Sequence, residues 1–215
     1  MTETELAQAK KRLRAEIREK RRTLDPAYVR AADAEIARRL TALPEFQAAR
    51  SIFCFISLPQ EIDTLPILKR AWAEGKLVAA PRCGPEGSMR LLVIRGPEDL
   101  AEPGFFGIRE PKEDCPEVSP EDIDLTIVPC VTADRTGMRL GYGGGYYDRF
   151  FAEKGAGDRA VLCRTKLLSE CVPAGAHDHR IPVVVTEEGV IRIPQGGADP
   201  INDLQQQKEN GHVGH

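Results

Sequence analysis

The run RLGYGGGYYD at positions 139–148 carries the strongest chemical signal in the chain. Its three consecutive glycines, at 143–145, let backbone N–H groups turn toward one point and let a ligand approach closely. The run follows a predicted buried strand and precedes a predicted helix, whose N-terminus adds a partial positive charge. We interpret the run as a phosphate-binding loop, with a flexible linker as the alternative.

The same residues exclude two common nucleotide-binding motifs. The run lacks the Gly-Lys-Ser/Thr of a Walker A loop, and Tyr146 stands where the dinucleotide-binding pattern requires its last glycine. Asp148 lies at the junction of loop and helix, where a carboxylate either binds Mg²⁺ or caps the helix. Local spacing does not separate these two roles.

Charged residues elsewhere offer further candidate contacts. Lys10 and Arg14 lie one helical turn apart, so both can face one ligand, although a solvated basic face is the alternative. Glu61 follows a predicted strand, at an edge where open α/β sheets form ligand crevices, and a helix-entry residue is its alternative. Asp178 lies in the run His-Asp-His, and two alternating histidines without further ligands are a weak transition-metal signal.

The elements that must position these residues alternate between helices and strands. Two amphipathic N-terminal helices are predicted, over residues 3–22 and from Asp25-Pro26 onward, because apolar residues recur there every three or four positions. Further helices are predicted over 64–74 and 146–153. Apolar runs predict strands at 51–56, 77–80 (ended by Pro81), 89–94, 124–129, 160–163, 183–185 and 190–191.

This alternation predicts an α/β fold of three layers, αβα, with a mainly parallel central sheet. We expect a single domain over residues 1–193. Residues 194–215 are rich in Gly, Gln, Asn and His, which predicts a disordered tail.

Composition limits the class of protein. The chain has 215 residues, 41% of them hydrophobic, and a net charge of −3, which gives no reason to expect a nucleic-acid partner. No run approaches the roughly 20 apolar residues that span a bilayer, so no membrane partner is expected. The N-terminus lacks the apolar core of a signal peptide. Six cysteines without C-x-x-C spacing predict a reduced, cytoplasmic protein.

The glycine-rich run, preceded by Asp134 and Gly137, resembles the signature of the 5-formyltetrahydrofolate cyclo-ligase family, also called methenyltetrahydrofolate synthetases. The resemblance extends from about residue 9 to about residue 190. It includes, in order, KKRLR at 10–14, EIDT at 61–64, PR at 81–82, GIREP at 107–111, Asp178 and Thr186-Glu187. It implies an ATP- and Mg²⁺-dependent ligase that cyclises 5-formyltetrahydrofolate to 5,10-methenyltetrahydrofolate and releases ADP and phosphate.

The chemistry that the resemblance implies needs no nucleophile from the enzyme. Phosphorylation of the formyl oxygen creates a leaving group, and N10 of the substrate attacks the activated carbon. The protein must mainly position two substrates and stabilise charge on phosphates. The lack of an obvious Ser-His or Cys-His pair is therefore no objection.

Site residues follow from the resemblance, position by position. Those expected to bind ATP are Lys10, Arg14, Arg139, Gly141, Gly143, Gly144, Gly145, Tyr146 and Tyr147. Those expected to bind the folate are Ile56, Glu61, Tyr142, Gly143, Gly144, Gly145 and Tyr146. Asp148 and Asp178 resemble the Mg²⁺ ligands, and Arg139 and Tyr147 are the expected catalytic residues. For Ile56, a place in the core is the alternative.

Two other functions compete with this interpretation. A sugar-phosphate isomerase or a CoA transferase would use the same phosphate cradle, but would not need ATP. A nucleic-acid binder would use the basic helix at 3–22, which carries a net charge of +4 from eight bases and four acids. Its affinity would fall steeply with salt. We expect ATP and the folate as small-molecule partners of a monomer.

Overall fold

The central sheet organises the molecule. The protein is described by a computed structural model over residues 1–84, 87–103, 107–153 and 157–194. Within these ranges, seven strands form one sheet in the order β3-β2-β1-β4-β7-β8-β9. The inner strands are parallel, and β3 and β9 are antiparallel edges. The strands are β1 (Ser51–Cys54), β2 (Leu77–Cys83), β3 (Met89–Val93), β4 (Leu125–Val128), β7 (Asp158–Leu162), β8 (Val183–Val185) and β9 (Val190–Arg192).

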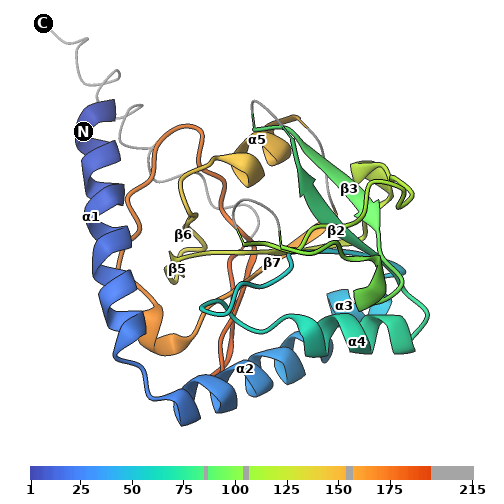
Figure 1. Ribbon diagram of the computed structural model, residues 1–215. Coiled ribbons are helices and arrows are strands. Elements are labelled where there is room, and N and C mark those ends of the chain that lie inside the picture. The colour runs from blue at the N-terminus through green and yellow to red at the C-terminus, as the bar shows by residue number, and fades with distance from the viewer. Residues whose placement is uncertain (85–86, 104–106, 154–156, 195–215) are drawn as a thin grey trace, which may run out of the picture.

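Helices cover both faces of this sheet, which confirms the predicted three-layer α/β fold. The helices are α1 (Glu3–Arg22), α2 (Pro26–Thr41), α3 (Pro44–Ala48), α4 (Leu65–Ala73) and α5 (Tyr146–Glu153). Figure 1 shows α2 and α4 side by side on one face of the sheet and α5 on the other. One buried cluster joins α2, α3 and α4 to the sheet, and a second joins α1 and α5 to its opposite face.

Local sequence signals explain where the helices begin. Thr2 accepts a hydrogen bond from the backbone of Glu5 while the Glu5 side chain accepts one from Thr2, which forms a capping box at α1. Asp25 caps α2, and Pro26 occupies its first turn. Ile17 of α1 is fully buried, as its place on the predicted apolar stripe requires.

Pro81 does not end its strand, contrary to the sequence prediction, because β2 continues to Cys83. The pairing of β2 with β1 stops at Ala79, so the last residues of β2 pair only with β3. A proline is tolerated there because its missing N–H faces no central partner strand.

Short 3₁₀ turns and one small hairpin were not predicted. The 3₁₀ turns are Pro97–Asp99, Pro120–Asp122 and Thr165–Leu167. The hairpin pairs β5 (Thr132–Ala133) with β6 (Arg139–Leu140). The buried Asp134 carboxylate closes its turn by accepting hydrogen bonds from Thr136 and Met138. This hairpin delivers Arg139 and the glycine-rich run to the end of the sheet.

Two further predictions concern the C-terminal tail and membrane-spanning helices. The predicted disordered tail lies outside the described residues, except for residue 194. Over the described part of the chain, no helix has both the length and the apolar character needed to cross a membrane.

Candidate functional site

The glycine loop, residues 141–145, is held from both sides. Gly143 and Gly145 have φ values of 107° and 67°, which favour glycine over any other residue. Nε of Arg14, from α1, donates to the Gly141 carbonyl at 2.8 Å. Nη2 of Arg149, from α5, donates to the Gly144 carbonyl at 2.5 Å. The loop is therefore shaped before any ligand binds, as a phosphate cradle at a helix N-terminus requires.

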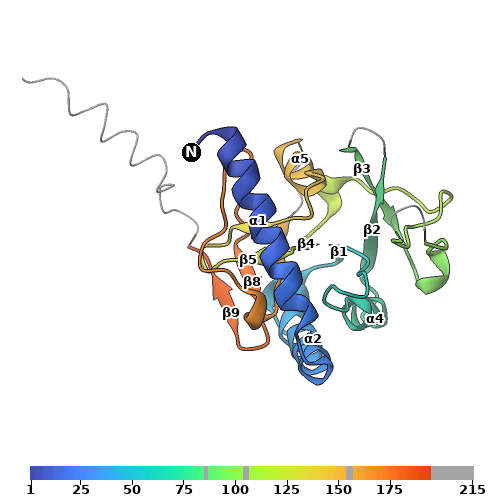
Figure 2. The same ribbon diagram turned by 60° about the vertical axis from the view of Figure 1, so that its left-hand side comes forward.

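Lys10 lies one turn before Arg14 on α1 and pairs with a residue far along the chain. Its Nζ is 2.6 Å from both carboxylate oxygens of Asp178, and both side chains are largely buried. The backbone N–H of Gly175 also donates to Asp178 at 2.6 Å. Figure 2 shows α1 crossing in front of the molecule. The two bases thus reach the glycine loop and the Asp178 turn from the same helix.

Arg139 is the buried base of the site, with a side chain only 3% exposed. Its Nη2 donates to Oδ1 of Asp148 at 2.8 Å, and its guanidinium lies over the Tyr147 ring at 5.7 Å. Arg139 Nε and the Tyr147 hydroxyl are both buried without a hydrogen-bond partner among the described residues. An unsatisfied buried polar group costs about 1–3 kcal/mol, so both atoms favour a ligand or water that supplies the missing partner.

The Tyr147 hydroxyl stays protonated in this setting. Burial raises its pKa well above the ordinary value, and the nearby Arg139 only partly opposes that rise. The ring is fixed by stacking on Phe53 of β1, with ring centroids 5.9 Å apart. Tyr147 can therefore donate a hydrogen bond to an oxygen that gains negative charge.

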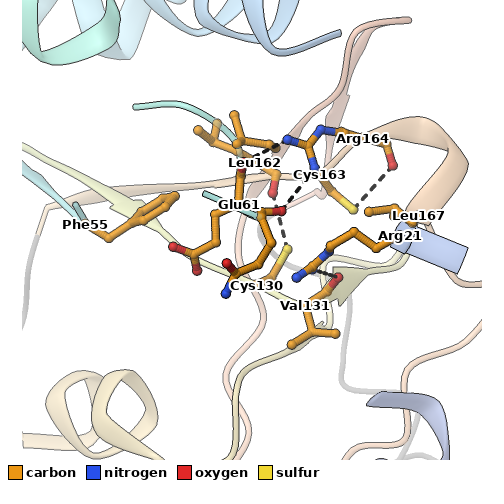
Figure 3. Close-up of a pocket in the computed structure, with 11 residues that line it drawn as sticks. Arg21, Phe55, Glu61, Cys130, Val131, Leu162, Cys163, Arg164 and Leu167 are labelled. Atoms are coloured by element: carbon orange, nitrogen blue, oxygen red, sulfur yellow. Dashed lines mark hydrogen bonds between the residues drawn. The ribbon is translucent and has the colours of Figure 1, made fainter. Parts of the chain in front are cut away.

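A second feature is a small pocket at the carboxyl ends of β1, β4 and β7 (Figure 3). Ligand crevices are expected at this edge of an open α/β sheet. The residues that line it are Arg21, Phe55, Gln60, Glu61, Ile62, Cys130, Val131, Leu162, Cys163, Arg164 and Leu167. Glu61 and the two arginines are its charged members, so the pocket suits a polar ligand with hydrogen-bond donors.

Burial controls the ionisation of Glu61. Desolvation raises its pKa, while the backbone N–H of Leu58, the Tyr142 hydroxyl and the charge of Arg21 oppose the rise. The Leu58 N–H donates to Oε2 at 2.7 Å. Desolvation of its hydroxyl, together with the charge of Glu61, raises the pKa of Tyr142, although the residue is 46% exposed. Tyr142 belongs to the glycine loop, and Arg21 of the pocket approaches its hydroxyl, so the loop lies beside the pocket.

Arg21 belongs to this site, although it was not among the predicted site residues. Its guanidinium donates to the Val131 carbonyl at 3.2 Å and approaches the Tyr142 hydroxyl at 3.5 Å. Its Nε is buried without a partner among the described residues. The signal was its spacing: Arg21 follows Arg14 by seven residues, or two helical turns, on the face that already carried two candidate bases.

The remaining predicted contacts are placed as follows. Ile56 packs against the first core cluster, and its neighbour Phe55 lines the pocket. The Tyr146 ring lies under the Arg149 guanidinium, 5.5 Å from it, at the start of α5. Folate contacts by Ile56 and Tyr146 stay predictions.

Asp148 and Asp178, the predicted Mg²⁺ ligands, each hold an ion pair with a site base. Their side chains are 27% and 16% exposed, so both remain accessible to a ligand. Among the described residues, no group of three or more His, Cys, Asp or Glu side chains could hold a metal. One or two carboxylates, with substrate phosphates and waters, suffice for Mg²⁺. The donor set therefore fits Mg²⁺ bound together with a nucleotide.

Comparison with known proteins gives one consistent result. The sequence model of the 5-formyltetrahydrofolate cyclo-ligase family matches residues 6–187. The 5-formyltetrahydrofolate cyclo-ligase of Escherichia coli is 35% identical over 135 residues, which are 62% of this chain and 74% of that protein. The family predicted from the glycine-rich run is thus the one that matches.

Solved structures agree with this result. The 5,10-methenyltetrahydrofolate synthetase of Aquifex aeolicus superposes with a TM-score of 0.76 at 30% identity, covering 88% of this chain and 95% of that one. The corresponding synthetase of Mycoplasma pneumoniae has a TM-score of 0.67 at 17% identity, covering 83% and 98%. The latter likeness supports the fold alone.

Proposed function

The chain belongs to the 5-formyltetrahydrofolate cyclo-ligase family, and we propose that it uses ATP and Mg²⁺ to convert 5-formyltetrahydrofolate into 5,10-methenyltetrahydrofolate, ADP and phosphate. One observation carries the proposal: Arg21, which lines the pocket with Glu61, approaches the Tyr142 hydroxyl of the glycine loop at 3.5 Å. Phosphoryl transfer between two substrates requires their sites to meet, and here one side chain bridges them. We further propose a cytoplasmic monomer with reduced thiols, and all six cysteines are free in the structure.

The folate half of the proposal rests on Glu61. An ionised carboxylate accepts two parallel hydrogen bonds from the amidine-like edge of a pterin. Those donors replace the water that Glu61 lost on burial, so the ligand offsets the cost that raises the Glu61 pKa. Arg21 lines the same pocket, and its charge and the Tyr142 hydroxyl favour the ionised form of this carboxylate.

The nucleotide half rests on α1 and the glycine loop. Lys10 and Arg14 are placed to neutralise phosphate oxygens, and the loop supplies backbone N–H groups. Bound Mg²⁺ would offset the charge of the same phosphates, with Asp148 and Asp178 as its protein ligands. Its binding would weaken the ion pairs of these two carboxylates and leave Lys10 and Arg139 available to phosphate oxygens.

The chemical step transfers the γ-phosphoryl group of ATP to the formyl oxygen. Arg139 stabilises the negative charge on the transferred group, and the Tyr147 hydroxyl donates to one of its oxygens. N10 of the substrate then attacks the activated carbon, N10 loses its proton to solvent, and the C–O bond breaks as phosphate leaves. Neither step needs a nucleophile from the protein.

The test is an absorbance assay. Purified protein with ATP and Mg²⁺ is expected to convert 5-formyltetrahydrofolate into a product with methenyl absorbance, and omission of ATP is expected to abolish the signal. Folded protein that gives no signal with both substrates would overturn the proposal. Activity without ATP would instead favour an isomerase-like or transferase-like use of the same cradle.

Asp148→Asn tests the proposed metal ligand. The variant is expected to lose activity with little loss of thermal stability, because an amide keeps the hydrogen bond from Arg139 but loses the charge that attracts Mg²⁺. An unfolded variant, or a folded one with nearly full activity, would assign Asp148 a structural role at the helix start.

A further inference from the structure

Two residues that were not among the predicted site residues, Arg164 and Asp33, make hydrogen bonds to the loop that carries Glu61. Arg164 directly follows Cys163 at the end of β7, and its side chain is 3% exposed. Its Nε and Nη2 donate to the two carboxylate oxygens of Asp33, on α2, at 2.7 and 2.8 Å. This two-point geometry is the one that fixes a guanidinium against a carboxylate.

The same guanidinium also holds the backbone of the Glu61 loop. Nη2 donates to the Glu61 carbonyl at 2.7 Å, and Nη1 points at the Gln60 carbonyl at 3.4 Å. Figure 3 shows the Arg164 side chain reaching over to this backbone. Asp33 also contacts the loop, since its Oδ2 accepts from the Asp63 N–H at 3.2 Å. The ion pair therefore makes hydrogen bonds to the loop backbone both before and after the Glu61 side chain.

We propose that Arg164 and Asp33 are positioning residues for folate, which set the place of the Glu61 carboxylate: Arg164 lines the pocket, but its donors hold Asp33 and the Glu61 loop. This inference rests on the proposed function, in which Glu61 binds the pterin. A buried ion pair adds little to stability compared with apolar residues of equal volume. The ion pair instead fixes the orientation of the loop. A guanidinium offers several donors in a fixed geometry, and these join the carboxylate of Asp33 on α2 to two successive carbonyls of the loop.

The remaining anchors of the loop do not fix Glu61 in the same way. Thr64 and Ser57 exchange backbone and side-chain hydrogen bonds at its base. The Leu58 N–H contacts the Glu61 carboxylate itself, so it moves with that side chain. Ile62 packs in the first core cluster, which holds the loop against the core but makes no contact with the Gln60 and Glu61 carbonyls. Loss of Arg164 would leave these two carbonyls without their side-chain donor. A shift of about 1 Å at a binding group is enough to cost up to ~10²-fold in rate.

The experiment compares the two substrates in steady-state kinetics. Arg164→Gln is expected to raise KM for 5-formyltetrahydrofolate about tenfold or more, while KM for ATP changes less than about twofold. Arg164→Lys is expected to raise the folate KM less than Arg164→Gln does, because it keeps the positive charge opposite Asp33 but loses the two-point geometry of the guanidinium. Arg192→Gln is the matched control: Arg192 makes a two-point pair with Glu45 at the β9 edge, and its loss is expected to leave both KM values unchanged.

A double-mutant cycle separates positioning from general destabilisation. If Arg164 acts through Glu61, then Arg164→Gln has a much smaller effect on the folate KM in a Glu61→Gln background. The proposal would be overturned if the effects of Arg164→Gln and Glu61→Gln on the folate KM multiply in the double variant. It would also be overturned if Arg164→Gln raises the KM values for folate and ATP by the same factor. If Arg164→Gln does not fold, Asp33→Asn gives the same readouts, because it weakens the pair while keeping its shape. Wild-type protein that fails to use 5-formyltetrahydrofolate would overturn the proposed function instead.

Discussion

The two sides of the glycine loop handle charge differently. On the phosphate side the bases already have carboxylate partners, since Lys10 pairs with Asp178 and Arg139 with Asp148. In the folate pocket the carboxylate of Glu61 is met by a backbone N–H and a tyrosine hydroxyl, and burial raises its pKa. These two bases thus have partners before a ligand binds, whereas Glu61 still needs hydrogen-bond donors.

The two sides would therefore be stabilised by their ligands in different ways. In the proposed function, a polyphosphate with Mg²⁺ would exchange one set of ion pairs for another, so these charged side chains would keep partners of opposite charge. A pterin brings donors to a carboxylate that burial has made costly to ionise, so binding offsets a cost that folding imposed. Variants of the phosphate side should therefore affect kcat, and variants of the pocket should affect KM for the folate.

The largest effect is expected at Arg139. Arg139→Met should lower kcat about 10³-fold, in the range seen when an arginine that stabilises a transferred phosphoryl group is lost. Single-turnover phosphoryl transfer checks this value. Arg159→Met is the matched control, because Arg159 also lies over an aromatic ring, that of Phe151, and takes no part in the proposed site. A kcat within tenfold of the wild type in folded Arg139→Met would remove Arg139 from the chemistry.

Glu61→Gln should act on KM instead. Hydrogen bonds to a charged group contribute about 1.5–3 kcal/mol, so KM for 5-formyltetrahydrofolate is expected to rise about 10- to 100-fold with KM for ATP unchanged. Thermal stability should be equal or higher, which differential scanning fluorimetry measures. The native pKa of Glu61 is raised, so its contribution to stability is present at low pH and lost as pH rises through that pKa. A neutral glutamine removes that loss.

The pH dependence provides a second readout at Glu61. As pH falls toward the raised pKa, Glu61 gains a proton and loses its capacity to accept two hydrogen bonds. The folate KM of the wild type should therefore rise at a higher pH than the ordinary glutamate pKa of about 4.3 predicts. In Glu61→Gln this dependence should be absent. An identical pH profile in both proteins would contradict the assignment.

The smallest effect is expected at Tyr147. Tyr147→Phe removes a buried hydroxyl that has no partner among the described residues, so thermal stability should stay equal or rise while kcat falls about tenfold. Tyr28→Phe is the matched control. The Tyr28 hydroxyl bonds Glu187, so its loss should lower stability by about 1 kcal/mol and leave kcat unchanged. Lower stability with full activity in Tyr147→Phe would contradict a role for its hydroxyl.

Local patterns in the chain were enough to predict most elements. The bounds of α1 and α5 match their predictions, because capping residues and apolar periodicity act within one or two turns. The buried runs at β1 and β4 matched strands covered on both faces. The prediction that Pro81 ends its strand was wrong. Local sequence could not show that β1 stops pairing with β2 at Ala79, two residues before the proline.

The residues alone were enough to predict the family and the α/β class, because both depend on residue types at short, fixed spacing. Only the tertiary structure decided which distant residues meet. It joined Lys10 to Asp178, Arg21 to Tyr142 and Arg164 to Asp33, pairs separated by 121 to 168 positions. Such contacts depend on strand order and helix placement, and no local spacing encodes them.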